Sequence, residues 1–597
     1  MAFHLRFEFN VPQNEIDILV RSLPLYFAVR VISFIIGKTY AGIIKYTGAE
    51  DALRMFKTLV IGTLIMLAAN FIRAKFFDGQ YFFPISILVI DLMLCFIGLM
   101  AYRIATKMLY QQAINPSSGK RKVVVYGAGE AGVITKRTLD RDANTKLQVV
   151  AFIDDDKKKS GKRLEGVPIY HSSKLEQLLS DKGAEQVILA IQKPSSENRQ
   201  AIIDTALSHS VPVLSVPPVN DWIKGKLSYK QLKPIKIEDL LERKEIELDK
   251  AMIRSMIEGK KVMVTGAAGS IGSGIVKQLI PFGPKQIVLF EQAESPLYEL
   301  QLELEEISKS TEIICAIGDV RNPDRMANVF KTFEPEIVYH AAAYKHVPLM
   351  ENNPSEAILT NILGSKIAAD LASKYGVKTF VLISTDKAVN PTSVMGASKR
   401  IAEMYCQSLN KKSDTSFITT RFGNVLGSNG SVIPIFKKQI EKGGPVTITH
   451  ENINRFFMTI AEACQLVIEA GAMGKGGEIF IFDMGESVRI KDLALNMIRL
   501  SGLEPGKDIE VKITGLRPGE KIFEELLTKE EGTLPTHHEK IMVAKVREND
   551  HAEVNENVTE LIGLFTGQNN TEIVTKMKDI VPEYISHNSM FEQLDLS

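Results

Sequence analysis

The chain has 597 residues, of which 45% are apolar and 24% are charged, a composition typical of a globular protein with several domains. Its formal net charge of +1 argues against a protein that binds nucleic acid. The four scattered cysteines, Cys95, Cys315, Cys406 and Cys464, form neither a disulfide framework nor a metal site, and we expect no bound metal.

Three apolar runs lie near the N-terminus. A helix needs about 20 mostly apolar residues to cross a bilayer. We therefore predict three membrane-spanning helices, at residues 23–44, 57–76 and 81–104, within a membrane region at residues 1–112. Arg30, Lys38 and Asp91 are costly inside such helices. The alternative is a buried helical core in a soluble protein.

Positive charge orients the predicted helices. Lysine and arginine are concentrated between the first and second runs and after the third, so both of these regions should face the cytoplasm. The short loop between the second and third runs then faces outward. We expect a multi-pass protein of the bacterial inner membrane whose soluble domains lie in the cytoplasm.

A first alternation of strands and helices follows. In "VVVYGAGEAG" a buried strand precedes Gly127, Gly129 and Gly132, and this spacing lets the backbone approach a pyrophosphate at a helix N-terminus. Asp154 ends the next strand, where a ribose would be bound. We predict a Rossmann-like domain at residues 119–218 without catalytic residues. It either binds a nucleotide at Gly127, Gly129 and Gly132 or keeps only a structural cleft, because the motif alone is a weak signal.

After a polar connector at residues 219–250 the pattern restarts in a domain that we place at residues 251–597. In "VMVTGAAGSIGS" a strand precedes Gly266, Gly269 and Gly272. Glu291 ends the next strand, where a carboxylate bonds the ribose hydroxyls and repels a 2′-phosphate. The sequence therefore favours NAD over NADP as the cofactor.

Polar residues follow a later strand of the same domain. The strand in "TFVLISTDK" ends at Thr385, Asp386 and Lys387, and ligands of open α/β sheets bind beyond the carboxyl ends of the strands. Lys399 follows on a helix that we expect to start near Ser393. These side chains should meet at the mouth of the cleft.

The motifs "TGAAGSIGS", "HAAAYKHVP", "STDKAVNPTSVMGASKR", "TRFGNVLGSNGSV" and "RPGEKIFEELL" together resemble one family. It is the large, membrane-bound UDP-N-acetylglucosamine 4,6-dehydratases of polysaccharide and glycan biosynthesis, in the extended branch of the short-chain dehydrogenase/reductase superfamily. The resemblance implies an α/β fold in which N-terminal transmembrane helices precede two Rossmann-like domains with doubly wound parallel sheets. The second domain would carry a small C-terminal substrate-binding subdomain. The resemblance also implies bound NAD, a nucleotide-sugar substrate and a homo-oligomer.

The resemblance also assigns site residues. For the cofactor they are Gly266, Gly269, Ser270, Ile271, Gly272, Glu291, Asp319, Val320, Ala341, Ala342 and Lys399. For the substrate they are Lys345, His346, Asn424, Arg455, Arg517 and Glu520. For catalysis they are Thr385, Asp386, Lys387, Met395 and Lys399.

A 4,6-dehydratase oxidises C4 of the sugar, removes the C5 proton with the C6 hydroxyl, and returns the hydride to C6. We expect Asp386 to protonate the leaving oxygen O6, and Lys387 to take the C5 proton after Lys399 and the exclusion of water have lowered its pKa. Thr385 would bond O4. Met395 stands where the superfamily usually has a tyrosine, and its thioether carries no proton. The O4 proton must leave through Asp386, Thr385 or an ordered water. Large members with this methionine tend to retain the C5 configuration.

Two other functions fit part of the pattern. A UDP-sugar 4-epimerase would also oxidise C4, but it needs no acid and base at C5 and C6. A membrane-anchored sensor or scaffold would bind nucleotides without turnover. It would explain Met395 but leave the group Thr385, Asp386, Lys387 and Lys399 without a role.

Overall fold

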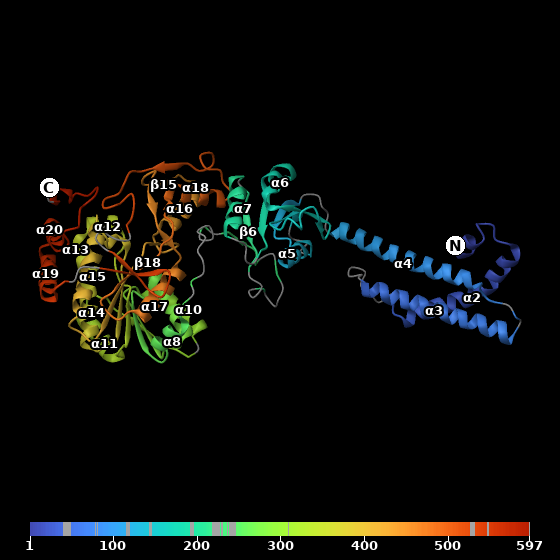
Figure 1. Cartoon of the computed structure of the whole chain (residues 1–597), viewed down its shortest axis with the longest axis horizontal. Helices are drawn as coiled ribbons and strands as arrows, with labels where there is room; N and C mark the ends of the chain where they lie inside the picture. The colour runs from blue at the N-terminus through green and yellow to red at the C-terminus, as the bar shows by residue number, and fades with distance from the viewer. Residues whose placement is uncertain are drawn as a thin grey trace.

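The computed structural model of the chain describes residues 1–39, 49–77, 79, 81–114, 120–141, 146–191, 196–209, 211–217, 249–308, 310–525, 532–545 and 549–595. It also describes residues 222, 227–228, 231–235, 237, 246 and 248. The molecule is elongated (Figure 1). Apolar helices lie at one end, the larger α/β domain lies at the other, and the smaller α/β domain lies between them. The predicted α/β fold class is confirmed.

The three apolar helices are α2 (Gln13–Ile36), α3 (Ala49–Phe76) and α4 (Ile85–Ile114), and each is long and apolar enough to cross a membrane. The predicted bounds 23–44 of the first helix are wrong. The helix begins ten residues earlier, because polar residues continue the backbone hydrogen bonding, and it ends at Ile36. Residues 40–48, which include the end of the predicted run, lie outside the described residues.

A polar cluster joins these helices. Arg30 of α2 donates to the Asp91 carboxylate of α4 at 2.5 Å and to the Leu59 carbonyl of α3 at 3.0 Å. The Tyr26 hydroxyl donates to the other Asp91 oxygen at 2.9 Å. Arg30 and Asp91, whose charges are costly inside apolar helices, therefore neutralise each other between the helices, as charged groups inside membrane proteins usually do.

The smaller domain holds a seven-stranded sheet in the order β3-β4-β2-β1-β5-β6-β7, in which β3 (Arg163–Leu164) and β4 (Val167–His171) form one edge. Its centre is parallel, with β1 (Arg121–Tyr126) between β2 (Leu147–Asp154) and β5 (Gln186–Leu189). The predicted domain end at residue 218 is wrong, because β7 (Lys233–Pro234) adds an antiparallel edge to β6 (Val213–Ser215). Apolar side chains in this otherwise polar stretch, Trp222, Leu227 and Leu232, are buried against the sheet.

The larger domain holds a nine-stranded sheet in the order β10-β9-β8-β11-β12-β13-β18-β22-β21, in which β22 (Ile541–Ala544) and β21 (Thr533–Pro535) form an antiparallel edge. The first seven strands are parallel, and the order of connection reverses between β8 and β11, where ligands of such sheets bind. The parallel strands are β8 (Lys261–Thr265), β9 (Gln286–Glu291), β10 (Glu312–Ile317), β11 (Ile337–His340), β12 (Thr379–Ile383), β13 (Ser416–Arg421) and β18 (Ile479–Phe482).

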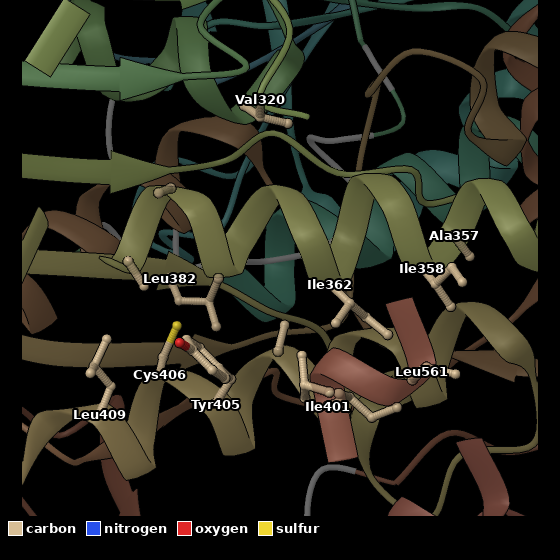
Figure 2. Packing of buried hydrophobic residues seen from close by; sticks show 14 of the residues in the cluster. Val320, Ala357, Ile358, Ile362, Leu382, Ile401, Tyr405, Cys406, Leu409 and Leu561 are labelled. Atoms are coloured by element: carbon tan, nitrogen blue, oxygen red, sulfur yellow. The ribbon is translucent and has the colours of Figure 1, made fainter. Parts of the chain in front are cut away.

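Each face of this sheet is covered by a core of apolar side chains. On one face α15 (Val394–Asn410) packs beneath the helical stretch that ends in α14 (Gly364–Lys374), and α19 (His551–Gly563) and α20 (Asn570–Ile580) pack on α15. Figure 2 shows part of this core, where Ile401 of α15 lies across from Ile362. The helix that carries Met395 and Lys399 is thus packed on several sides.

A small subdomain stands beside the carboxyl ends of the strands. Its core joins α16 (Val432–Glu441) and α18 (Ile490–Leu500) to the strand pair β15 (Val446–Ile448) and β20 (Val511–Ile513). Helix α18 also lies against α7 (Ser196–Ser208) of the smaller domain. The expected C-terminal subdomain is therefore present, and it contacts both α/β domains.

A buried ion pair holds α15 to the sheet. Arg421, the last residue of β13, donates through Nε to Glu403 Oε1 at 2.8 Å and through Nη2 to Oε2 at 2.6 Å. Both side chains are almost fully buried. Ser384, which follows β12, donates to Glu403 Oε1 at 2.6 Å. Burial alone would raise the pKa of Glu403, but Arg421 holds that pKa below its ordinary value.

Glu403→Gln should destabilise the larger domain by about 3–5 kcal/mol, because it removes the negative charge that pairs with the buried Arg421 guanidinium. The loss should appear as a lower melting temperature and faster hydrogen exchange in α15. The matched control is Glu583→Gln, since Glu583 pairs with Arg400 but its side chain is 33% exposed. We expect the control to stay within about 1 kcal/mol of the wild type. Equal losses in the two variants would contradict the importance of the buried pair.

Candidate active site

The glycine-rich turn between β8 and α9 (Ser270–Leu279) has no room for a side chain at Gly266 or Gly272. Gly266 has φ of +63°, and a Cβ there would lie 2.8 Å from the backbone of Ala342. At Gly272 a Cβ would lie 2.2 Å from the Gly266 carbonyl oxygen. The turn therefore brings bare backbone to the mouth of the cleft, as a dinucleotide diphosphate requires.

Two cavities border this turn. The first lies over β9 and β10, and Glu291, Asp319 and Val320 are among its lining residues. The second, of about 510 Å³, runs from the glycine turn to Lys399 and Met395. Between them they are lined by all eleven predicted cofactor residues: Gly266, Gly269, Ser270, Ile271, Gly272, Glu291, Asp319, Val320, Ala341, Ala342 and Lys399.

Two carboxylates are fixed at the first cavity. Glu291 Oε2 accepts a hydrogen bond from the Ala268 N–H of the glycine turn at 3.2 Å, and its other oxygen accepts from the Gln292 and Ala293 N–H groups. Asp319 is paired with Arg321 at 2.6 Å. Burial alone would raise the pKa of Asp319, but Arg321 holds it below its ordinary value. Both carboxylates thus stand ready to accept hydroxyl donors.

Asp386 is fully buried at the end of β12. Its Oδ1 accepts hydrogen bonds from the Thr385 hydroxyl at 2.9 Å and from Lys387 Nζ at 3.0 Å. Its Oδ2 is buried, lacks a hydrogen-bond partner among the described residues, and lies beside Gly423, where a Cβ would be 3.0 Å away. Thr385 and Lys387 line the second cavity. Asp386 lies behind them and does not line the cavity itself, but it is hydrogen-bonded to both side chains that do.

Lys387 is held by three oxygen atoms. Its Nζ lies 3.0 Å from Asp386 Oδ1, 3.3 Å from Asn424 Oδ1 and 3.5 Å from Glu524 Oε1. Burial alone would lower the pKa of Lys387, but Asp386 and Glu524 together raise it above its ordinary value. The prediction that the pKa of Lys387 falls is therefore wrong: burial acts in the expected direction, but the two carboxylates outweigh it.

Helix α15 brings Met395 and Lys399 to the second cavity. Ser393 caps the helix by accepting a hydrogen bond from the Gly396 N–H at 3.2 Å. Gly396 lies so close to the Lys387 carbonyl that a Cβ would be 2.2 Å from its oxygen. Met395 is 3% exposed and belongs to the apolar core. Burial lowers the pKa of Lys399 to about 8. Of Lys387 and Lys399, the lysine with the depressed pKa is therefore Lys399.

A third cavity opens beside the second, over the small subdomain. It is lined by apolar side chains of the subdomain, and Lys387 and Asn424 line both cavities. The six predicted substrate residues divide between these two cavities. Lys345, His346 and Asn424 line the second cavity, and Asn424, Arg455, Arg517 and Glu520 line the third.

Arg455 is 8% exposed and is engaged with the "RPGEK" loop. Its guanidinium donates to the carbonyls of Asn454, Lys521 and Ile522. It also lies 3.5 Å from both Glu520 and Glu524. These contacts hold the loop in place, whereas Arg517 is exposed at the cavity.

Two buried carboxylates near the site were not predicted from the sequence. Glu524, with a side chain 3% exposed, lies in the quoted motif "RPGEKIFEELL" but was given no role. Glu351, 2% exposed, accepts hydrogen bonds from the Val394 N–H at the start of α15 and from the Ser589 hydroxyl, both at 2.6 Å. No signal in the sequence marked Glu351, because its partners are more than forty positions away.

The smaller domain repeats one feature of the larger. Asp154 Oδ2 at the end of β2 accepts a hydrogen bond from the Ala128 N–H of its glycine turn at 2.8 Å, as Glu291 does from Ala268. Lys159 also pairs with this carboxylate at 2.9 Å. A nucleotide at Gly127, Gly129 and Gly132 stays a prediction.

The pH dependence of the free energy of unfolding should reveal the lowered pKa of Lys399. The pKa falls from an ordinary 10.5 to about 8 on folding, so the unfolded chain binds more protons between these values, and stability rises with pH across that window. Lys399→Met should remove this gain, on the order of 3 kcal/mol. Denaturant unfolding across the window measures it. The exposed Lys378→Met is the control, and parallel curves for Lys399→Met and the wild type would contradict the assignment.

The chain is similar to known proteins along most of its length. Residues 262–546 match the model of a family described as "Polysaccharide biosynthesis protein", and residues 119–208 match a "C2185-like, N-terminal" model. The chain is 39% identical to the capsular polysaccharide biosynthesis protein CapD of Staphylococcus aureus, across 94% of each chain.

Two further relatives match the larger domain. A UDP-N-acetylglucosamine 4,6-dehydratase (inverting) of Campylobacter jejuni is 35% identical across 47% of this chain and 80% of that protein. A UDP-glucose 4-epimerase of Rickettsia bellii is 35% identical across 46% of this chain and 80% of that protein. With the CapD match extending over nearly the whole of both chains, this chain belongs to the CapD-like polysaccharide biosynthesis protein family, whose larger domain has the extended short-chain dehydrogenase/reductase fold.

Proposed function

We propose that the protein is an NAD-dependent 4,6-dehydratase that converts UDP-N-acetylglucosamine into a UDP-4-keto-6-deoxy-N-acetylhexosamine for glycan synthesis. The observation that carries the proposal is the junction of the cofactor cavity and the subdomain cavity at Lys387 and Asn424. Thr385 and Lys399 line the cofactor cavity beside this junction, and Asp386 lies behind Thr385 and Lys387. In this proposal the apolar helices hold the enzyme in the inner membrane, with both α/β domains in the cytoplasm.

The residues of the cleft fit NAD. The glycine turn leaves room for the diphosphate, and the Glu291 carboxylate would accept the ribose hydroxyls and repel a 2′-phosphate. Lys399 would hold the nicotinamide ribose. Bound NAD supplies the hydride acceptor for C4 and the hydride donor for C6.

The third cavity fits the uridine diphosphate end of the substrate. Arg517 presents an exposed guanidinium for a phosphate, and Glu520 would accept the ribose hydroxyls. Arg455 acts from beneath by holding the loop that carries both residues. Lys345 and His346 lie on the cofactor side, where they would contact the sugar.

Thr385 and Asp386 would take the O4 proton. The Thr385 hydroxyl lines the cavity and already donates to the buried Asp386 carboxylate at 2.9 Å. A proton from O4 passes to Thr385 as the Thr385 proton passes to Asp386. Met395 takes no part in this transfer, and its apolar side chain keeps water from the reacting atoms. The same path then returns the proton to O6 as the hydroxyl leaves as water.

Lys387 would act at C5. Once Asp386 is protonated, Lys387 loses the charge that most strongly raises its pKa, so it becomes a base only after C4 has been oxidised. Its Nζ removes the C5 proton and later returns it from the same face. A single base on one face retains the C5 configuration.

The reaction is tested by incubating the detergent-solubilised full chain with UDP-N-acetylglucosamine in deuterated water. We expect a product with a 4-keto group, a C6 methyl and deuterium at C5 in the original configuration, identified by NMR and mass spectrometry. Conversion to UDP-N-acetylgalactosamine would establish a 4-epimerase instead. Bound nucleotide without conversion would establish a non-catalytic sensor.

The proton path is tested by Asp386→Asn, which keeps the shape of the side chain but cannot store a proton. Its kcat should fall by about 10²–10⁴-fold while KM changes little. The exposed Asp414→Asn serves as the control and should retain wild-type kcat. If Asp386→Asn turned over at a rate close to that of the wild type, the O4 proton would have another acceptor.

A further inference from the structure

We propose that Glu524 is the residue that takes the proton from Lys387 and so allows Lys387 to act as a base. The inference rests on the proposed dehydratase function and adds a residue to which no role was assigned. Glu524 contacts Lys387 and not the reacting atoms, so it is a positioning and proton-holding residue.

The need for such a residue follows from the surroundings of Lys387. The three N–H groups of its ammonium face three oxygen atoms, those of Asp386, Asn424 and Glu524. A base must first lose a proton, and that proton requires an acceptor. The Asn424 amide oxygen is a very weak base, and Asp386 already carries the O4 proton at this step. Glu524 is the remaining acceptor among the described residues around Nζ.

The geometry of Glu524 suits this task. Its Oε1 lies between Lys387 Nζ and Arg455 Nε, at 3.5 Å from each, while its Oε2 is buried without a hydrogen-bond partner among the residues described. Its side chain is 3% exposed, so a proton placed there would not exchange freely with water. The Nζ to Oε1 distance must shorten by about 0.5 Å for transfer, as hydrogen bonds in catalytic sites often do when substrate binds.

The charges of the cluster balance before and after the transfer. The charged groups facing Lys387 are Asp386, Glu524 and Arg455, which give a neutral set with Lys387 itself. The O4 proton neutralises Asp386, and the Lys387 proton then neutralises Glu524. Nζ takes the C5 proton and later gives it back, and Glu524 finally returns its proton to Nζ. No proton is gained or lost from the cluster over one turnover.

Glu524→Gln tests the proposal in the full-length enzyme, because the amide keeps the shape but cannot hold the proton. At neutral pH we expect kcat to fall by about 100-fold with KM within about threefold of the wild type. Part of the rate should return at alkaline pH, where hydroxide replaces Glu524 as the acceptor. Incorporation of deuterium at C5 should slow in parallel.

The matched control is Glu525→Gln, the same change one residue further along. Glu525 is 48% exposed and contacts Lys521 and Asn390, so wild-type kcat is expected. Glu524→Asp keeps an ionisable group and should give an intermediate kcat with a normal pH profile. This second variant and a melting curve distinguish proton transfer from misfolding.

The outcomes separate the possible causes. A Glu524→Gln enzyme with wild-type kcat would overturn the inference, since the negative charge would then serve only to hold the ammonium. A loss of rate that did not change with pH would also overturn it, because it would indicate a structural role. Reduced nicotinamide accumulating on Glu524→Gln would support it, since C4 oxidation precedes the blocked step. No reduction in wild type or variant would refute the dehydratase function itself.

Discussion

The candidate site depends on one buried carboxylate. Glu403 on α15 accepts hydrogen bonds from Ser384 after β12 and from Arg421 at the end of β13. The residues that follow Ser384 are Thr385, Asp386 and Lys387, and the cavity residue Asn424 follows Arg421 closely. One turn before Glu403 lies Lys399. A single ionic contact, shielded from water, thus fixes the relative positions of three chain segments that meet at the cavity.

Within this frame the chemistry is distributed over charges that compensate one another. Asp386 and Glu524 flank Lys387, and Arg455 lies behind Glu524. Because Lys387 contacts both carboxylates, protonation of one of them changes the proton affinity of the other groups, which imposes an order on the proposed proton transfers. Met395 fits this arrangement as an apolar wall. In the proposed mechanism the Asp386 carboxylate and the Thr385 hydroxyl perform the task that a tyrosine hydroxyl performs elsewhere in the superfamily.

Much of this could be predicted from the sequence, since it depends on local pattern. Glycine spacing, strand ends and apolar runs indicated the two sheets and the three apolar helices, and the family resemblance supplied the eleven residues that line the first two cavities. The pKa of Lys387 could not be predicted, because its sign depends on Glu524, which lies over a hundred positions away and is placed by the fold. The contacts of Glu351 and the burial of Trp222 could not be predicted for the same reason. The start of α2 was not predicted, because the helix begins in polar residues that a hydropathy pattern does not detect.

The polar cluster between the apolar helices bears on how the chain is made. Arg30 is synthesised on α2, and its counter-charge Asp91 follows only on α4. Until then each residue is an isolated charge in an apolar helix, a penalty of about 2.5–3.5 kcal/mol on the scale of translocon insertion. Helix α2 is therefore poorly suited to enter the lipid alone. The pairing therefore favours insertion of the three helices into the membrane as one unit, before the larger domain is translated.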